Sequence, residues 1–270
     1  MNIVRTLTAL TLVITALCAF VQGCGVMPNG RRWGQDVTLA PGLDTAAQAA
    51  GRAAMSPRVF VPALAALMCR IENADERIVR WARQKTPTSG SPAKAERLSS
   101  QLRSASLIIF HASVLATPGG ADAGQWAISK AKCYAVQGGA AAVVNELVFA
   151  LKDASRRKRP GNKDDDSFPS GHAANAAAFT ALASRNVSAM TLPGDLKTCL
   201  DAGLVSLAAL TAWERVEAGV HYPSDVLAGM ALGSFVAFFL NDTFMGIGTT
   251  ASPEVIIGPD GWYAGLAVRF

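Results

Sequence analysis

The stretch that decides the fold runs from residue 204 to residue 240 and reads LVSLAALTAWERVEAGVHYPSDVLAGMALGSFVAFFL. Two apolar, alanine-rich runs flank a short polar segment that ends at Pro223. Proline suits the first turn of a helix, where its missing N–H is not needed. The sequence therefore predicts two long helices, over Leu196–Glu217 and Pro223–Asn241, with a short connection between them.

Similar helical patterns continue toward the N-terminus, without an internal repeat or a series of alternating strands. Half of the 270 residues are apolar, which is enough for one good core. The expected helices in this part are Val59–Arg83, Ala93–Ala116, Gln125–Lys152 and Gly171–Asn186. Within the third, Gly138-Gly139 is expected to permit a close helix contact. The sequence thus predicts an all-α bundle of about six helices.

The C-terminal residues 249–270 have a different pattern. Val255-Ile256-Ile257 and the run 262–270 flank Gly258-Pro259-Asp260-Gly261, which is typical of a turn. The last run alternates in polarity and ends on an aromatic residue, as the last strand of an outer-membrane barrel does. Because such a barrel needs at least eight strands, the sequence instead predicts a C-terminal β-hairpin packed on the bundle.

The N-terminal residues 1–23 resemble an export signal, with Arg5 before an apolar run that is short for a membrane span. Residues 21–24 read VQGC and resemble a bacterial lipobox, so Cys24 is expected to be lipidated and residues 24–55 to form a tether. An uncleaved anchor or an ordinary signal peptide is the alternative. Gly25 after the cysteine resembles outer-membrane sorting.

These features predict an exported, periplasm-facing lipoprotein of the bacterial cell envelope. Its helical domain would cover residues 56–248, with the motif-bearing core at 125–245. The apolar run 226–240 has fifteen residues, and Asp201 interrupts the helix before it. Since a span needs roughly 20 apolar residues, we expect a soluble domain held near a membrane by the lipid on Cys24.

Charge and cysteines narrow the function classes further. The positive charge is concentrated in residues 152–159, which read KDASRRKR, rather than spread over the chain. A run of this kind fits nucleic acid, anionic lipid or a phosphate site; the motifs below favour phosphate, and no nucleic-acid partner is expected. Cys69, Cys133 and Cys199 allow at most one disulfide. Their spacing does not resemble a zinc site.

Three segments carry residue types that suit a bound phosphate. In the first, Lys152 and Arg159 are seven residues apart, two helical turns, before Pro160 ends the helix. On this spacing Arg156 shares their side, while Arg157 and Lys158 are expected to be exposed. Two cations on one helix face can neutralise a phosphate and donate to its oxygens.

The second segment is Phe168-Pro169-Ser170-Gly171-His172, followed by an alanine-rich run. Ser170 is expected to be the N-cap of a helix, and Gly171 lets the backbone approach a ligand closely. Free N–H groups at the start of this helix favour an anion. His172 would face whatever is bound there.

The third segment is Arg215, five residues, His221, three residues and Asp225. With Pro223 in the first turn of a helix, His221 immediately precedes it and Asp225 lies within that turn. A carboxylate there can accept a hydrogen bond from one imidazole nitrogen and leave the other free to attack. The two histidines thus suit a nucleophile and a general acid.

Together these segments resemble the type 2 phosphatidic acid phosphatase (PAP2) superfamily, which also includes bacterial class A acid phosphatases and vanadium haloperoxidases. The resemblance covers about residues 125–245. It implies that His221 forms a phosphohistidine with Asp225 orienting it, and that His172 protonates the leaving alkoxide. The phosphoryl oxygens would be held by Lys152, Arg159, Ser170, Gly171 and Arg215. The family usually has serine where this chain has Glu214, which puts one phosphate contact in doubt.

The function that this resemblance implies is a phosphatase without metal or other cofactor, acting on a phosphorylated lipid or a small phosphomonoester. A vanadium haloperoxidase would use the same residues to hold vanadate, with His221 as its ligand. A non-catalytic lipoprotein scaffold that binds phosphate or anionic lipid is the alternative of another class. Glu214 and the barrel-like tail favour that scaffold, whereas the pair of histidines favours the enzyme.

Overall fold

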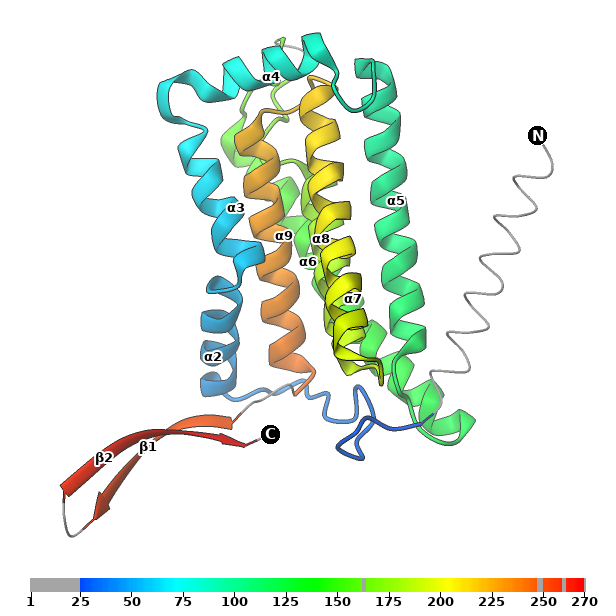
Figure 1. The fold of residues 1–270 in the computed structure, drawn as a ribbon, viewed down its shortest axis with the longest axis vertical. Coiled ribbons are helices and arrows are strands. Elements are labelled where there is room, and N and C mark those ends of the chain that lie inside the picture. The colour runs from blue at the N-terminus through cyan, green and yellow to red at the C-terminus, as the bar shows by residue number, and fades with distance from the viewer. Residues whose placement is uncertain (1–24, 162–163, 247–249, 259–260, 270) are drawn as a thin grey trace.

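A computed structural model describes residues 25–161, 164–246, 250–258 and 261–269. Its described residues form a helical bundle with two further strands (Figure 1). The helices are α2 (Leu43–Ala54), α3 (Pro57–Met68), α4 (Ala74–Lys85), α5 (Pro92–Ala116), α6 (Ala123–Ser155), α7 (Gly171–Ala189), α8 (Gly194–Glu217) and α9 (Pro223–Phe244), with a 3-10 turn at Ile71–Asn73. The all-α class is confirmed.

The expected number of about six helices is wrong, since the described residues contain eight α-helices. The segment Val59–Arg83 is two helices, because the chain turns after α3 and Asn73 adopts a left-handed conformation with φ of 57°. Asparagine tolerates this conformation better than most residues. The second helix, α4, then crosses one end of the bundle (Figure 1).

The remaining extra helix, α2, lies in the segment expected to be a tether. Residues 25–54 pack on the bundle: α2 contacts α9, and the backbone of Gly25 pairs with that of Gly120. Trp33 is buried, and its indole Nε1 donates to Asn186 Oδ1 at 3.0 Å. These contacts give the segment a fixed position on the bundle. The predicted leader at 1–23 and the predicted lipidation of Cys24 concern residues outside the described part.

The centre of the bundle is α7, which packs against α5, α6, α8 and α9. Its alanines let neighbouring helices approach closely, and two glycines of α9 do the same from the other side. A Cβ at Gly229 would lie 2.7 Å from the Ser170 carbonyl oxygen, and one at Gly233 would lie 2.0 Å from that of Ala174. By contrast, a Cβ at Gly138 or Gly139 would meet nothing within 4 Å. The close helix contact expected at Gly138-Gly139 is therefore not observed. The close contact lies between α7 and α9 instead.

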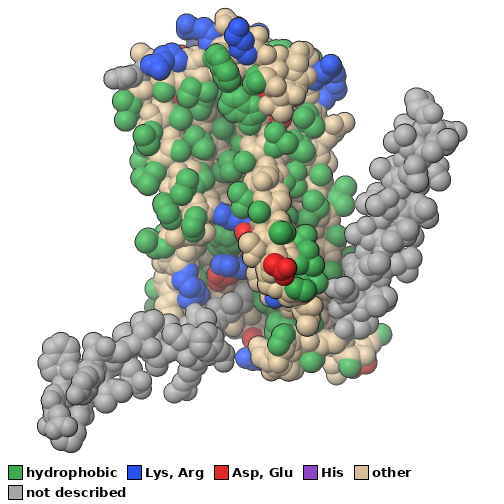
Figure 2. Space-filling model, in the orientation of Figure 1, with side chains coloured by type: hydrophobic (Ala, Val, Ile, Leu, Met, Phe, Trp, Pro, Cys, Tyr) green, Lys and Arg blue, Asp and Glu red, His purple; other side chains and the backbone are tan. Residues whose placement is uncertain are grey.

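Three of the described helices, α6, α8 and α9, are long and apolar enough to cross a membrane by length and composition. This corrects the expectation that the apolar runs are too short. Counting only uninterrupted apolar side chains underestimated them, because glycine, serine and threonine are tolerated within a span. Figure 2 shows hydrophobic side chains over the visible side of the bundle and lysine and arginine gathered at the upper end. That upper end carries α4 in Figure 1.

The C-terminal strands β1 (Thr250–Gly258) and β2 (Gly261–Arg269) pair antiparallel, with Thr250 opposite Arg269. In Figure 1 they extend from the lower end of the bundle, so the expected packing along the helices is not observed. The cysteines left open by the sequence, Cys69, Cys133 and Cys199, are free thiols.

Candidate active site

The three motif segments meet at the end of the bundle that α4 crosses (Figure 1). Helices α6 and α8 end there, and α7 and α9 begin there, so residues far apart in sequence become neighbours. The charges of Lys152, Arg159 and Arg215 all act on both His172 and His221. The fold thus gathers both histidines and three motif cations into one cluster.

His221 lies directly before α9 and is 2% exposed. Its Nδ1 is 2.8 Å from the carbonyl oxygen of Ser167. Because a carbonyl only accepts, Nδ1 carries the hydrogen, which leaves the lone pair on Nε2. Burial lowers the pKa of His221 well below its usual value, and the neighbouring cations lower it further. The imidazole is therefore neutral, with a free nitrogen, at neutral pH.

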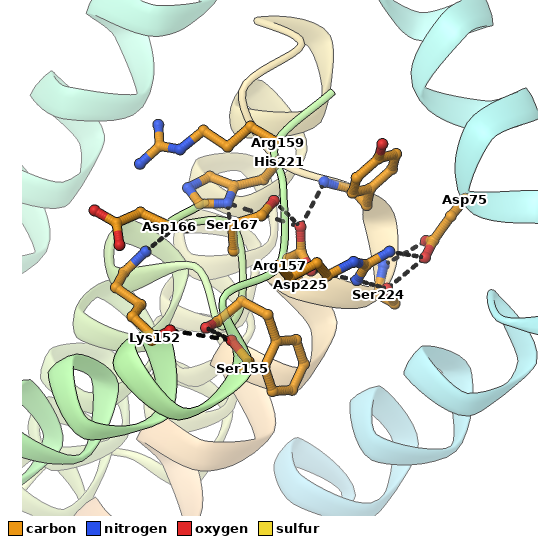
Figure 3. A network of polar contacts seen from close by, with 12 residues as sticks. Asp75, Lys152, Ser155, Arg157, Arg159, Asp166, Ser167, His221, Ser224 and Asp225 are labelled. Atoms are coloured by element: carbon orange, nitrogen blue, oxygen red, sulfur yellow. Dashed lines mark hydrogen bonds and ion pairs between the residues drawn. The ribbon is translucent and has the colours of Figure 1, made fainter. Parts of the chain in front are cut away.

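Asp225 lies in the first turn of α9, as expected, but it does not bond to His221. Its Oδ2 is 3.9 Å from His221 Nδ1, which is too long for a hydrogen bond. The same oxygen accepts from Ser167 Oγ at 2.6 Å and from the backbone N–H of Tyr222 at 2.9 Å. Ser167, which the sequence analysis missed, thus connects the histidine to the carboxylate (Figure 3).

Lys152 and Arg159 reach the cluster by a different route from the one expected. Helix α6 ends at Ser155, and Arg156 takes up a left-handed conformation with φ of 44°. Pro160 is therefore not what ends the helix, and Arg159 lies in the following loop. The ammonium of Lys152 donates to the Asp166 carbonyl, and Arg159 Nε lies 2.7 Å from Asp164 Oδ1. The loop 164–166 holds both cations in position.

Two motif residues present buried donors without a partner. Ser170 is the N-cap residue of α7, as expected, but its side chain makes no cap hydrogen bond. Its buried Oγ and the Nε of Arg215 have no hydrogen-bond partner among the described residues. Arg215 is nevertheless fixed in place, because its Nη1 donates to Ser99 Oγ at 3.2 Å. A buried donor without a partner is costly, and an anion bound here would satisfy both.

Helix α5 forms a further wall of the cluster, which the motifs did not predict. Ser100 Oγ lies 3.3 Å from His172 Nε2. Arg103 is one turn further along α5, on the same side, and its buried Nε also lacks a hydrogen-bond partner in the described structure. Burial, followed by the charges of Arg215, Arg103, Arg159 and Lys152 in that order, lowers the pKa of His172 to about 4. Arg103 therefore lies close to His172.

Arg157 was expected to be exposed and is not. Its side chain is 19% exposed and forms ion pairs with Asp75 and Asp225 (Figure 3). Arg156, expected on the side of Lys152, is exposed and pairs with Asp153 at 3.3 Å. Lys158 is exposed, as expected. Helix α6 ends at Ser155, so helical spacing does not apply to the residues after it. This explains why Arg157 is largely buried and Arg156 is exposed, the reverse of the expectation.

The Glu214 carboxylate contacts the loop between α4 and α5. Its Oε2 accepts from Ser89 Oγ at 2.5 Å, in the loop between α4 and α5. The neighbouring Glu217 accepts from the N–H groups of Thr88 and Ser89 at 3.2 and 2.7 Å. The two carboxylates thus hold that loop, and the departure from the usual serine leaves the cluster intact.

The described residues contain no group of three or more histidine, cysteine, aspartate or glutamate side chains arranged for a metal ion. The site is built from the side chains described above. It combines a neutral buried histidine, a second histidine among cations, and several donors aimed at one anion. This arrangement suits transfer of a phosphoryl group.

Comparison with known proteins agrees with this chemistry. Residues 133–246 match the PAP2 superfamily. The lipid A 1-phosphatase of Rhizobium johnstonii is 30% identical over 43% of this chain and 48% of that protein. The decaprenylphosphoryl-5-phosphoribose phosphatase of Mycobacterium tuberculosis is 35% identical over 38% of this chain and 56% of that protein. The chain thus spans about half the length of these curated relatives.

Among solved structures, the transmembrane PAP2 type phosphatidylglycerolphosphate phosphatase of Bacillus subtilis is 24% identical, with a TM-score of 0.49 over 67% of this chain and 91% of that chain. All three motif segments lie within or next to the matched residues and converge at one end of the bundle. Residues 133–246, which match the PAP2 superfamily, thus include the three motif segments that build this site.

Proposed function

We propose that this protein hydrolyses phosphate monoesters of membrane lipids through a phosphohistidine formed on His221. The observation that carries the proposal is the pairing of a neutral histidine, whose Nε2 is free, with buried donors that lack a partner. A nucleophile without an anion site, or an anion site without a nucleophile, would support binding or proton transfer only. Together they support phosphoryl transfer.

In the first step Nε2 of His221 attacks phosphorus and the bond to the leaving oxygen breaks. His172 gives its proton to that oxygen, so the alcohol leaves neutral. In the second step His172 takes a proton from water, the water oxygen attacks phosphorus, and the P–N bond breaks. Inorganic phosphate and the original histidines result.

The bound phosphoryl group would be held by four cations. Three come from the motifs: Lys152, Arg159 and Arg215. We propose Arg103 as the fourth, because its Nε is buried without a hydrogen-bond partner and lies close to His172. Ser170 Oγ and the N–H groups at the start of α7 near Gly171 would complete the contacts. In the absence of phosphate these cations disfavour the charged form of His172, and a bound anion would offset them.

A lipid substrate is favoured by the outside of the bundle and by the relatives. Large exposed apolar side chains line α3, such as Leu64, Leu67 and Met68, and α8, such as Leu196 and Leu200. Apolar surface of this extent marks contact with lipid or protein, and three helices are long enough for a span. Two relatives bear names that describe phosphatases of lipid-linked phosphates. We therefore propose an enzyme of the cell envelope that works at a membrane.

Lipidation at Cys24, after removal of residues 1–23, stays part of this proposal. Gly25 pairs with Gly120 at the end of the bundle opposite the site, so a lipid on Cys24 would anchor that end. Metabolic labelling with a fatty acid should mark the full chain, and Cys24→Ser should abolish the label. Equal labelling of both proteins would exclude lipidation at this cysteine.

The proposed intermediate can be tested by trapping. The full chain in detergent is mixed with a lipid monophosphate labelled at phosphorus and quenched in alkali within the first turnovers. Label should be found on His221 and be lost in His221→Ala. His111→Ala is the matched control, because His111 is exposed on α5 and outside the cluster. Turnover by His221→Ala at the wild-type rate would refute the mechanism.

A further inference from the structure

The Arg157 side chain contacts several neighbouring residues, although it is not one of the motif residues themselves. Its Nη1 pairs with Asp225 Oδ1 and donates to Ser224 Oγ at 2.7 Å. Its Nη2 lies 2.7 Å from Asp75 Oδ2, and its guanidinium lies 4.5 Å from the centre of the Tyr222 ring. Figure 3 shows this side chain between the two carboxylates. Such fixation is unusual for a long charged side chain, which loses much rotamer freedom when held.

Asp75 brings a helix from outside the matched residues into this network. It lies in α4, is 2% exposed, and accepts from Ser224 N at 2.9 Å and from Ser224 Oγ at 2.5 Å. The N–H of Ser224 is in the first turn of α9 and has no partner within its own helix. Asp75 therefore caps α9 from another helix, and it fixes the turn that carries Asp225.

The network explains why Asp225 does not reach His221. One carboxylate oxygen is taken by Arg157, and the other by Ser167 Oγ and the N–H of Tyr222. A buried carboxylate without a cation would favour the imidazolium form of a histidine 3.9 Å away. That form has no lone pair on Nε2 and cannot attack phosphorus.

We propose that Arg157, held by Asp75, is a positioning residue that neutralises Asp225 and thereby keeps His221 uncharged for attack. This inference rests on the proposed phosphohistidine mechanism. It assigns α4 a part in the reaction without contact to the substrate phosphate. The charges of Arg215, Arg159 and Lys152 lower the pKa of His221, and the Asp225 carboxylate lies 3.9 Å from its Nδ1. Arg157 determines how much of the Asp225 charge His221 experiences.

The test compares pH profiles of kcat/KM. If Arg157 had only a structural role, its replacement would alter the rate or the stability but not the pH at which activity falls on the acid side. In Arg157→Gln the Asp225 charge is no longer offset, so the acid limb that reports His221 should move up by about one pH unit or more. Arg157→Lys keeps the charge and should keep the limb. Arg156→Gln, an exposed neighbour in an ion pair with Asp153, is the matched control and should behave as wild type.

Arg157→Gln leaves the buried Asp225 without its cation, and Asp75 keeps only Arg70 at 3.7 Å, so this variant can fail to fold. The double variant Arg157→Gln/Asp75→Asn removes one of those charges and should still show the raised limb. Asp75→Asn by itself leaves Arg157 to Asp225 and should not raise it. An unmoved limb in a folded Arg157→Gln or double variant, with His221→Ala inactive, would overturn this inference and leave the proposed function standing. Full activity of His221→Ala would instead refute both.

Discussion

His172 and His221 belong to the same cluster, yet the structure gives them opposite surroundings. His221 is 2% exposed and its Nδ1 is fixed by a carbonyl, with two carboxylates and Arg157 behind it. His172 is half-buried, contacts the hydroxyl of Ser100, and experiences Arg215 and Arg103 most strongly. A fixed tautomer suits a nucleophile. A ring beside a hydroxyl and cations, whose protonation depends on a bound anion, suits an acid. Environment, rather than residue type, separates the two roles.

Replacing each histidine in turn should give the largest effects and tests whether the two residues have different roles. His221→Ala should lose activity by on the order of 10⁴-fold or more with any substrate, because the nucleophile is gone. His172→Ala should lose roughly 10²- to 10⁴-fold with an alkyl phosphate. With an aryl phosphate, whose leaving group needs no proton, its loss should be much smaller. Equal sensitivity of the two variants to the leaving group would contradict the assigned roles.

Arg103 offers a test of the His172 side. If it binds the phosphoryl group, Arg103→Gln should reduce kcat/KM by roughly tenfold to hundredfold, the range for a hydrogen bond to a charged group. Inorganic phosphate should inhibit the variant more weakly by a similar factor. Arg97→Gln, at an exposed position of the same helix, should change neither. A normal inhibition constant in Arg103→Gln would remove it from the phosphate site.

The pH dependence sharpens the comparison further. The acid must be protonated, and the pKa of His172 is lowered to about 4 in the free protein. Its protonated fraction therefore falls about tenfold for each pH unit above that value, and kcat/KM for an alkyl phosphate should decline as pH rises. Removing a cation raises the pKa of His172, so Arg103→Gln should move this basic limb upward. The ionisation of the substrate is the same for both proteins and cancels; coincident limbs would show that Arg103 does not act on His172.

The smallest effect is expected at Glu214, next to Arg215. Since its carboxylate bonds to Ser89 and not to the phosphate side, Glu214→Gln should change kcat/KM by less than about threefold. The melting temperature should fall by a few degrees, because one buried hydrogen bond to a charged group is weakened. A gain of tenfold or more in phosphate affinity would mean that Glu214 repels the substrate after all.

Much of the site could be predicted from sequence because its motifs are local. Ser170 and His172 are two residues apart at a helix start, and His221 and Asp225 flank another, so spacing and helix signals suffice to group them. Ser167, Asp75 and Arg103 could not be found this way. They come from a loop, α4 and α5, and only packing brings them to the motifs. Arg157 was missed because helical spacing was extended past Ser155, where α6 ends.

The fold, like the site, could be predicted from the sequence only in part. The sequence identified α5 to α9 with small errors at their ends, because each is a long run rich in alanine and other apolar residues. It failed at Cys69–Asn73, where a short turn separates α3 from α4, and at residues 25–54, whose polar composition conceals contacts such as that of Trp33 with Asn186. Helix α2 does have an apolar face of small side chains, with Ala49 and Ala53 buried, and its position is decided by packing against α9.

By itself, the sequence determined the all-helical class, the three motif segments and the types of side chain proposed to carry the chemistry. These are properties of neighbouring residues, because propensity, capping and motif spacing act over a few positions. The tertiary structure decided which nitrogen of His221 is free, that Asp225 is turned toward Arg157, and that α4 and α5 reach the site. Those outcomes depend on hydrogen bonds between segments distant in the chain, whose partners no local pattern specifies.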